Sequence, residues 1–263
     1  MLFAGIDIGS TTSKCCLVDE TGGRRAFSCI MTEFNRNVSG EKVLKEALKT
    51  AGASEAELGY VVSTGYGRKA YKRADRAIPE IIAHAAGTVR LYPDARTIID
   101  IGGQDSKIIG LNERGQVDTF EMNDKCAAGT GRFFEVLTHR LLGIEMEDLS
   151  DLIIRSEHPI EISSMCTIFA ESEIISYVSG GTAMEDIAAG TGYAIARRIV
   201  AQGQAARIPM KEQIIFSGGV AHNEGIRRIF EDLTGHKIIA AKDPQCTAAL
   251  GAAVTALKAY EKK

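Results

Sequence analysis

The chain opens with short apolar runs separated by glycine or polar turns, a pattern typical of β-strands. These runs predict strands at 2–8, 13–19, 25–31 and 60–64. Two other segments repeat their apolar residues every three to four positions, which predicts helices. The first is expected to begin at an N-cap Ser39, to end at Ala51 and to stop at Gly52. The second runs to about Leu91 and carries Pro79 in its first turn.

The strand pattern then starts again. Further strands are predicted at 97–101, 106–111 and 116–122. At an offset of 93 residues Asp7 matches Asp100, and Lys14 matches Lys107. A registered repeat of this kind indicates duplication. We therefore expect an α/β protein of two related halves, 1–95 and 96–263.

The rest of the second half is mainly helical by its periodicity. Helices are predicted at 130–142, 146–154, 167–178, 187–206, 224–233 and 247–260, and strands at 213–216 and 237–240. The last of these helices is a candidate to pack back on the first half.

Composition narrows the functional classes. The 263 residues carry 31 basic and 34 acidic side chains, a net charge of −3, which disfavours a nucleic-acid or anionic-membrane surface. Neither a signal peptide nor an apolar run long enough to span a membrane is evident, so a cytoplasmic protein is expected. In that compartment the six cysteines are expected to be thiols, metal ligands or redox groups and not disulfides. They contain no Cys-x-x-Cys spacing.

The turn after the first strand combines glycine with small hydroxyl residues. Its candidate phosphate ligands are Gly9, Ser10, Thr11, Thr12, Ser13 and Lys14. Turn amides and hydroxyls form a concave anion site, and glycine lets a phosphate approach the backbone. This turn is neither a Walker A loop nor a dinucleotide fingerprint.

The second half repeats that turn at Gly102, Gly103 and Gln104. One such turn is more often an ordinary hairpin, but two copies with aspartate at the same place favour a nucleotide site. Asp7 and Asp100 are hard oxygen ligands suited to Mg²⁺, through its bound waters.

A third glycine turn, at Gly218, Gly219 and Val220, opens into a helix and is a weaker candidate for contact with adenosine. Lys125 and Gln245 are additional candidates to contact the nucleotide. For each of these polar residues the alternative is a solvated side chain or a bond to the backbone.

Long motifs support a family resemblance over the whole chain. DIGSTTSK (7–14), DIGGQDSK (100–107) and FSGGVAHN (216–223) resemble the phosphate and adenosine motifs of the acetate kinase, sugar kinase, heat-shock chaperone and actin superfamily. STGYGR (63–68), EMNDKCAAGTGRF (121–133) and SSMCTIFAESEIIS (163–176) resemble the ATP-dependent activators, or component A, of 2-hydroxyacyl-CoA dehydratases. These activators are related to the ATPase subunits of benzoyl-CoA reductase.

The resemblance implies a duplicated actin-like or sugar kinase-like ATPase fold, with two α/β halves around a nucleotide cleft. It implies a homodimer that binds ATP or ADP with Mg²⁺ and shares one 4Fe-4S cluster between its subunits. The cluster ligands would be Cys126 and Cys166, and Asp7, Asp100 and Gln104 would be the catalytic residues. ATP hydrolysis would drive a hinge and send one electron to a partner dehydratase, with ferredoxin or flavodoxin as donor.

Spacing alone favours inert thiols at every cysteine, and only the resemblance reverses this for Cys126 and Cys166. The strand cysteines Cys15, Cys16 and Cys29 are expected to be buried and inert, whereas Cys246 is ambiguous. Cys126 is expected just before a helix N-terminus, which would stabilise a reduced cluster. An ATP-driven reorientation of that helix would then lower the cluster potential.

Two other functions remain open at this level. A small-molecule kinase of the same superfamily would need an acceptor pocket and a carboxylate base, and it leaves the segments around Cys126 and Cys166 unexplained. An iron-free switch would bind its partner in an ATP-dependent way. The sequence does not identify the 2-hydroxyacyl-CoA, because that choice lies in the partner.

Overall fold

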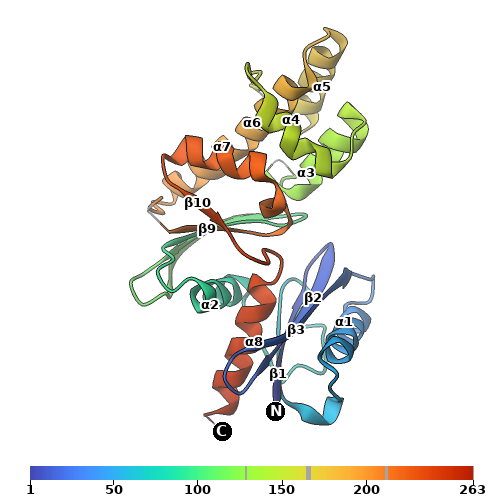
Figure 1. Ribbon diagram of the computed structural model, residues 1–263, viewed down its shortest axis with the longest axis vertical. Coiled ribbons are helices and arrows are strands. Elements are labelled where there is room, and N and C mark those ends of the chain that lie inside the picture. The colour runs from blue at the N-terminus through green and yellow to red at the C-terminus, as the bar shows by residue number, and fades with distance from the viewer. Residues whose placement is uncertain (128, 164–166, 211–212, 263) are drawn as a thin grey trace. The chain divides into compact units, whose positions relative to one another are not determined.

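The computed structural model describes residues 1–127, 129–163, 167–210 and 213–262. Unit 1 comprises 1–95, 111–118 and 245–263, and unit 2 comprises 96–110 and 119–244 (Figure 1). Each unit is built on a five-stranded sheet. In the part of the chain so described, no helix is long and apolar enough to cross a membrane.

The sheet of unit 1 has the order β3-β2-β1-β4-β5. Its strands are β1 (Leu2–Ile8), β2 (Thr12–Asp19), β3 (Arg24–Met31), β4 (Leu58–Thr64) and β5 (Arg76–Ala77). Its helices are α1 (Arg36–Ala51), the short η1 (Glu55–Glu57), α2 (Glu80–Leu91) and α8 (Thr247–Tyr260). The first three strands are antiparallel neighbours, and β4 runs parallel to β1. β5 was not predicted, because two residues carry no periodicity.

The C-terminal helix α8 packs in unit 1, beside β1 and α2 (Figure 1). Glycines on β1 and α2 allow α8 to lie close to both elements. A Cβ at Gly5 would lie 2.0 Å from the Ala249 carbonyl, and one at Gly87 would lie 1.9 Å from the Thr247 carbonyl. Backbone contact this close requires glycine, so the last helix is matched to the first strand.

The expected N-cap of α1 is wrong. Asn35 caps the helix, and its Oδ1 accepts the Asn37 and Val38 N–H groups at 3.0 and 3.4 Å. Ser39 lies inside the helix, and its hydroxyl accepts the Glu33 N–H at 2.8 Å. Asparagine and serine cap equally well, so composition did not decide between them.

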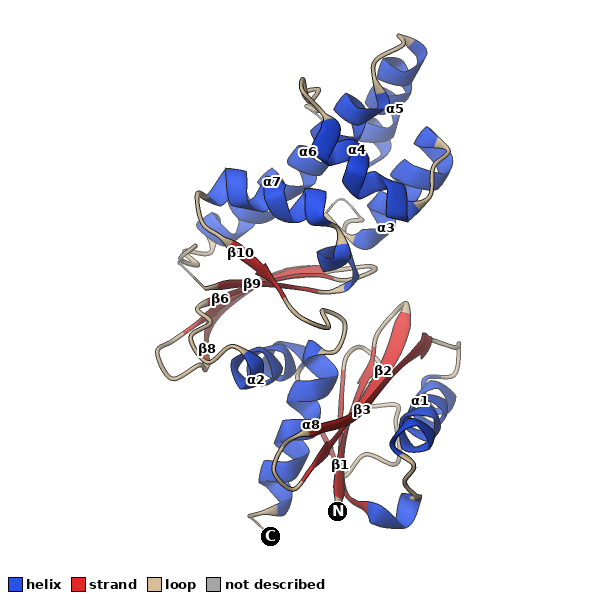
Figure 2. Ribbon diagram, viewed as in Figure 1, coloured by secondary structure: helices blue, strands red, loops and turns tan. Residues whose placement is uncertain are grey.

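The sheet of unit 2 has the order β10-β9-β6-β7-β8. Its strands are β6 (Thr97–Ile101), β7 (Ser106–Leu111), β8 (Val117–Asn123), β9 (Ile214–Ser217) and β10 (Ile238–Ala240). Its helices are α3 (Gly131–Glu135), η2 (Val136–Leu142), η3 (Met146–Asp148), α4 (Leu149–Arg155), α5 (Thr167–Ser179), α6 (Met184–Ala205), η4 (Gly219–His222) and α7 (Glu224–Thr234). They lie on one side of the sheet (Figure 2). The helix predicted over 130–142 is α-helical at first and then widens into the π-helix η2.

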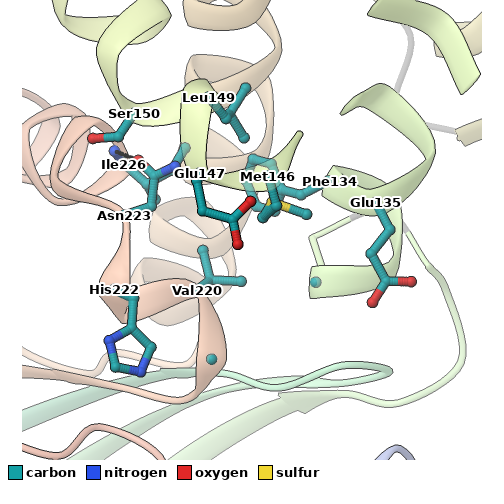
Figure 3. A pocket seen from close by; sticks show the side chains of 12 residues that line it. Phe134, Glu135, Met146, Glu147, Leu149, Ser150, Val220, His222, Asn223 and Ile226 are labelled. Carbon is teal, nitrogen blue, oxygen red and sulfur yellow. Dashed lines mark hydrogen bonds between the residues drawn. The ribbon is translucent and has the colours of Figure 1, made fainter. Parts of the chain in front are cut away.

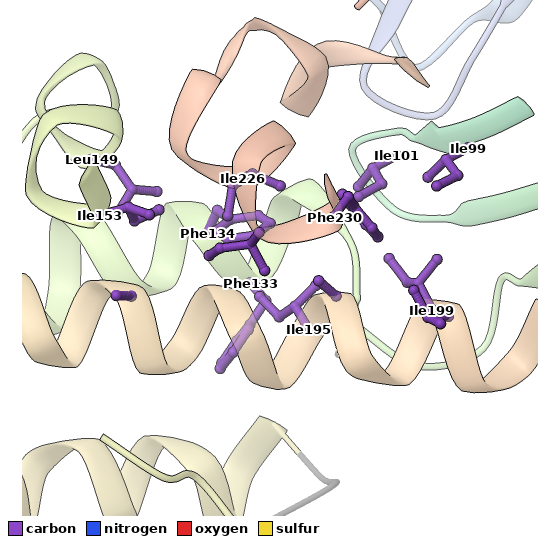
Figure 4. Close-up of a cluster of buried hydrophobic side chains, with 14 of the residues drawn as sticks. Ile99, Ile101, Phe133, Phe134, Leu149, Ile153, Ile195, Ile199, Ile226 and Phe230 are labelled. Atoms are coloured by element: carbon purple, nitrogen blue, oxygen red, sulfur yellow. The ribbon is translucent and has the colours of Figure 1, made fainter. Parts of the chain in front are cut away.

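Aromatic side chains fix α3 on the core of unit 2. Phe133 and Phe134 point from α3 into a cluster that rests on α6 (Figure 4). In the same cluster the rings of Phe216 and Phe230 meet edge to face, with centroids 5.4 Å apart. This packing holds the start of α3 in a defined place against β6 and β9.

Candidate phosphate turns and cysteine loop

The first phosphate turn joins β1 to β2. The Gly9 N–H donates to the Thr12 carbonyl at 3.1 Å and closes the turn. Asp7 and Lys14 are cross-strand partners, and the Lys14 ammonium lies 3.3 Å from Asp7 Oδ2. Asp7 Oδ1, in contrast, is buried and has no hydrogen-bond partner among the described residues.

Burial governs the titration of this pair. It raises the pKa of Asp7, although the Lys14 charge opposes the rise. Burial also works against the charged form of Lys14, but the nearby negative charges, Asp7 first among them, outweigh it and raise the pKa of Lys14. The pair is therefore held together by charge inside a poorly solvated turn.

The second phosphate turn, between β6 and β7, repeats this geometry. The Gly102 N–H donates to the Asp105 carbonyl at 2.9 Å, as Gly9 does to its own turn. Lys107 is buried between Asp100 Oδ2 at 3.1 Å and Asp105 Oδ2 at 2.8 Å. The Ser217 hydroxyl donates to Asp100 Oδ1 at 2.7 Å.

The duplication extends to a third strand, which lies outside the 93-residue repeat of the sequence. Thr64 is in register with Asp7 on β4, and Ser217 is in register with Asp100 on β9. A left-handed glycine follows each of them, Gly65 at φ 81° and Gly218 at φ 86°. The segment 63–68 thus occupies in unit 1 the place that the candidate adenosine motif occupies in unit 2.

Each of these glycines is pressed against its phosphate turn. A Cβ at Gly65 would lie 2.6 Å from the Ile8 carbonyl, and a Cβ at Gly218 would lie 2.2 Å from the Ile101 carbonyl. The two glycines are 153 residues apart and not 93, because α3 to α6 are inserted before β9. A search for a strand ending in hydroxyl-glycine would have found Thr64, Gly65 and Ser217.

The Cys126 loop follows β8. The Asn123 side chain donates to the Cys126 carbonyl at 2.9 Å and accepts the Cys126 N–H at 3.2 Å. The Thr130 hydroxyl donates to the Ala127 carbonyl at 2.8 Å. Cys126 itself is half-buried and is a free thiol.

The far end of this loop is bonded to the second phosphate turn. The Gly131 N–H donates to the Gly102 carbonyl at 2.8 Å, and the Arg132 N–H donates to the Gly103 carbonyl at 2.9 Å. Close approach is required here, because a Cβ at Gly131 would lie 3.0 Å from the Gly102 carbonyl. The phosphate turn and the start of α3 are therefore one hydrogen-bonded element.

The helix expected after Cys126 is present, and it begins one residue after the predicted residue 130. The helix begins at Gly131, five residues after Cys126, and its first two amides are hydrogen-bonded to carbonyls of the phosphate turn. The helix N-terminus therefore faces the phosphate turn and does not directly follow the cysteine. Cys166, the other expected cluster ligand, lies outside the described residues.

The remaining cysteines divide by burial. Cys15, Cys16 and Cys246 are buried, but Cys29 is exposed on the edge strand β3, so its expected burial is wrong. Burial raises the pKa of Cys15 far above its ordinary value. A hydrogen bond with Cys246 and burial do the same for Cys16. As thiols with so little thiolate, these two are poor nucleophiles and metal ligands.

A cavity of about 560 Å³ adjoins the third glycine turn in unit 2 (Figure 3). Phe134, Met146, Leu149 and Val220 supply apolar walls, and the Glu147 carboxylate points toward the space between them (Figure 3). Its other lining residues are Gly131, Glu135, Ser150, Gly219, His222, Asn223 and Ile226. An apolar cleft of this size with a few polar groups suits a small molecule such as a nucleoside.

The other candidate contacts lie at different places. Gln104 is exposed on the second phosphate turn, and Lys125 is exposed on the Cys126 loop. Gln245 is half-buried and belongs to unit 1, one residue before the N-cap of α8. Gln104 and Lys125 therefore lie on the two segments that the Gly131 and Arg132 amides join.

Comparison with known proteins gives one family. The profile described as the BadF/BadG/BcrA/BcrD ATPase family matches residues 4–256. The activator of lactoyl-CoA dehydratase from Anaerotignum propionicum is 40% identical over 264 residues, which cover 100% of both chains.

Solved structures agree with this match. The activator of the 2-hydroxyisocaproyl-CoA dehydratase from Clostridium difficile with bound ADPNP is 38% identical, with a TM-score of 0.92 over 100% of this chain and 96% of that chain. A ROK family glucokinase from Streptomyces griseus, in complex with glucose and AMPPNP, gives a TM-score of 0.58 at 15% identity, over 98% of this chain and 100% of that chain. The glucokinase shares the fold alone. The expected duplicated α/β fold of the sugar kinase type is confirmed.

Proposed function

Because this chain belongs to the BadF/BadG/BcrA/BcrD ATPase family, we propose that it hydrolyses ATP to activate a 2-hydroxyacyl-CoA dehydratase. The activation consists of delivering one low-potential electron to that partner. The relatives named as dehydratase activators, similar over their whole length, support this choice of partner.

One observation carries the coupling between nucleotide and electron. The carbonyls of Gly102 and Gly103 accept the amides of Gly131 and Arg132, directly after the Cys126 loop. A change at the phosphate turn that shifts those carbonyls also shifts the start of α3. A rigid, hydrogen-bonded connection of this kind transmits a displacement better than a flexible linker does.

Different groups of the chain suit the phosphates, the adenosine and the metal ion of the nucleotide. The turn after β1 and the turn after β6 each gather amides and hydroxyls that suit a phosphate. Adenosine occupies the cavity beside Gly219 and Val220, in which apolar walls cover the base. Mg²⁺ fits Asp7, since its buried Oδ1 lacks a donor that a metal-bound water would supply.

A 4Fe-4S cluster fits Cys126 by the chemistry of its side chain. Its thiol is free and half-buried, and Gly129, three residues later, adopts φ 94°, a conformation that favours glycine and so leaves that position without a side chain. We propose that Cys126 and Cys166, with their copies in a second subunit, hold one cluster in a homodimer. When bound, the cluster would supply a one-electron carrier, and the proposed electron donor is ferredoxin or flavodoxin.

Within that scheme this chain supplies the positions of the groups. Asn123 bonds both the carbonyl and the N–H of Cys126, which fixes the backbone that carries the thiol. We propose that Gln104, which is exposed on the second phosphate turn, orients the attacking water. Lys14 and Lys107 pair with the turn aspartates Asp7 and Asp100.

Purification without oxygen tests this function. We expect a brown dimer with about four irons and four sulfides per pair of chains. Cys126→Ser should remove the iron and spare ADP binding, whereas Cys29→Ser, which changes an exposed cysteine on β3, should keep the iron. A colourless, iron-free dimer that still binds ATP would contradict the proposal and favour an iron-free switch. ATP-dependent phosphorylation of a small molecule would favour a kinase.

A further inference from the structure

Thr32 lies directly after the edge strand β3 and contacts the first phosphate turn at three points. Its N–H donates to the Thr11 carbonyl at 2.9 Å. Its hydroxyl donates to the Gly9 carbonyl at 3.1 Å and lies 2.8 Å from the Ser13 hydroxyl. Thr32 is 18 residues beyond Lys14, the last residue of the motif 7–14, so the motif itself does not reveal this contact.

The two hydroxyls and the carbonyl form one chain of hydrogen bonds. A hydroxyl carries a single proton, and that of Thr32 goes to the Gly9 carbonyl. The Ser13 hydroxyl therefore donates to Thr32 Oγ1. Ser13 is also fully buried, so its hydroxyl is committed to the support of the turn.

The bond to Gly9 fixes the direction of a whole peptide group. A trans peptide is planar, and its C=O and N–H point in opposite directions. No cis peptide occurs in the described residues, so the Gly9 carbonyl that turns toward Thr32 directs the Ser10 N–H away from it. That N–H has no hydrogen-bond acceptor in the part of the chain that the structure describes. It is a donor that an anion can use.

Unit 2 satisfies the same carbonyl with a different donor. Gly102 is the counterpart of Gly9 in the repeat, and its carbonyl accepts the Gly131 N–H at 2.8 Å. The duplicated turns therefore share the bonded carbonyl but differ in its donor, a side-chain hydroxyl in unit 1 and a backbone amide of α3 in unit 2. A bond that both copies keep with unrelated groups indicates a requirement of the turn.

We infer that Thr32 is a positioning residue for the nucleotide phosphates. Its hydroxyl holds the Gly9 carbonyl and thereby presents the Ser10 N–H to a phosphate. Thr32 acts through this peptide group and does not itself contact the nucleotide. The inference rests on the proposed function, in which the turn after β1 receives a phosphate of ATP.

Equilibrium dialysis of the whole chain with labelled ADPNP, a non-hydrolysable ATP analogue, and with labelled adenosine tests the inference. Thr32→Val removes the hydroxyl but keeps the branched shape and the N–H, so ADPNP should bind about fivefold or more weakly. Adenosine has no phosphate, so its affinity should stay within about twofold. Thr32→Ser keeps the hydroxyl and should bind ADPNP within about twofold of the wild type. Ser28→Ala is the matched control, because Ser28 on β3 also donates its hydroxyl to a backbone carbonyl, that of Val43 at 2.8 Å.

Unchanged ADPNP binding in Thr32→Val would overturn the inference and leave the ATPase function standing. Equal losses of ADPNP and adenosine in Thr32→Val would also overturn it, as would an equal loss of ADPNP binding in Thr32→Ser or Ser28→Ala, because the effect would not come from the Thr32 hydroxyl acting on phosphate. A wild-type chain that binds ADPNP no more tightly than adenosine would contradict the proposed function instead. If Thr32→Val does not fold, Thr32→Ala replaces it and the same outcomes decide.

Discussion

The Lys107 ammonium lies 3.1 Å from the Asp100 carboxylate, fully buried, at the point where β6 meets β7. The same pair occurs 93 residues earlier between Lys14 and Asp7, at 3.3 Å, but there the lysine keeps 16% of its side chain exposed. The duplicated ion pair is thus buried more deeply in unit 2. The surroundings of the ion pair, and not its residue types, determine how much it contributes to the stability of each unit.

Lys107→Met should destabilise the protein strongly. The variant leaves Asp100 and Asp105 buried without their cation, a loss that typically costs about 3–5 kcal/mol. Urea unfolding measures this free energy. Lys14→Met is the matched control and should cost less, because its site is more exposed. Equal losses for the two variants would show that burial does not set the difference.

Gly131→Ala should uncouple the nucleotide from the cluster. The new Cβ would lie 3.0 Å from the Gly102 carbonyl and would push apart the hydrogen bonds that join α3 to the phosphate turn. Each such bond contributes about 1 kcal/mol. ADP should still bind, but the change in cluster potential between nucleotide-free and nucleotide-bound protein should shrink.

Gly180→Ala serves as the control for that experiment. A Cβ at Gly180 makes its nearest contact at 3.3 Å, with the Ser176 carbonyl of its own helix end. This variant should keep the full nucleotide-dependent change in potential. A full change in Gly131→Ala as well would show that another path carries the coupling.

Asn123→Ala should make the cluster labile. The substitution removes both bonds to the Cys126 backbone, each contributing about 1 kcal/mol, so release of iron to a chelator should accelerate about tenfold or more. Nucleotide affinity should be unchanged. Asn112→Ala is the control. Asn112 also accepts two backbone N–H groups, from Arg114 and Gln116, but its turn contains no cysteine. Equal rates of iron release in Asn123→Ala and wild type would show that the Asn123 bonds to the Cys126 backbone do not retain the cluster.

Glu224→Gln should change stability in a pH-dependent way. The hydrogen bond from Arg227 holds the pKa of Glu224 below its ordinary value, so the folded state prefers the ionised form. This contribution is present above the unfolded pKa and is lost as the pH falls through the lower, folded pKa. The wild type should therefore exceed the variant slightly at neutral pH and match it in acid.

The difference should be small, because Glu224 keeps 42% of its side chain exposed at the start of α7 and solvent screens the pair. Urea midpoints measured across a series of pH values give this comparison. A difference that grows as the pH falls would contradict the assigned direction.

The sequence alone determined every strand except β5, most helices and the family. β1 and α8 were predicted with the bounds that the structure has, because an apolar run into Gly9 and a long apolar periodicity are local signals. The 93-residue repeat likewise needed only residues close together in each hairpin. These features depend on neighbours along the chain, which a sequence displays directly.

Tertiary structure decided what depends on pairing between distant segments. The match of Thr64 with Ser217 became visible only when β4 paired with β1 and β9 with β6, since the insertion of α3 to α6 changes the spacing. The absence of a partner at Asp7 Oδ1 among the described residues and the hydrogen bond from Gly131 to Gly102 also depend on how segments far apart in the chain pack together. A repeat in sequence records common residue types, but the partner that each side chain meets is set by packing, and packing made two equal aspartates different.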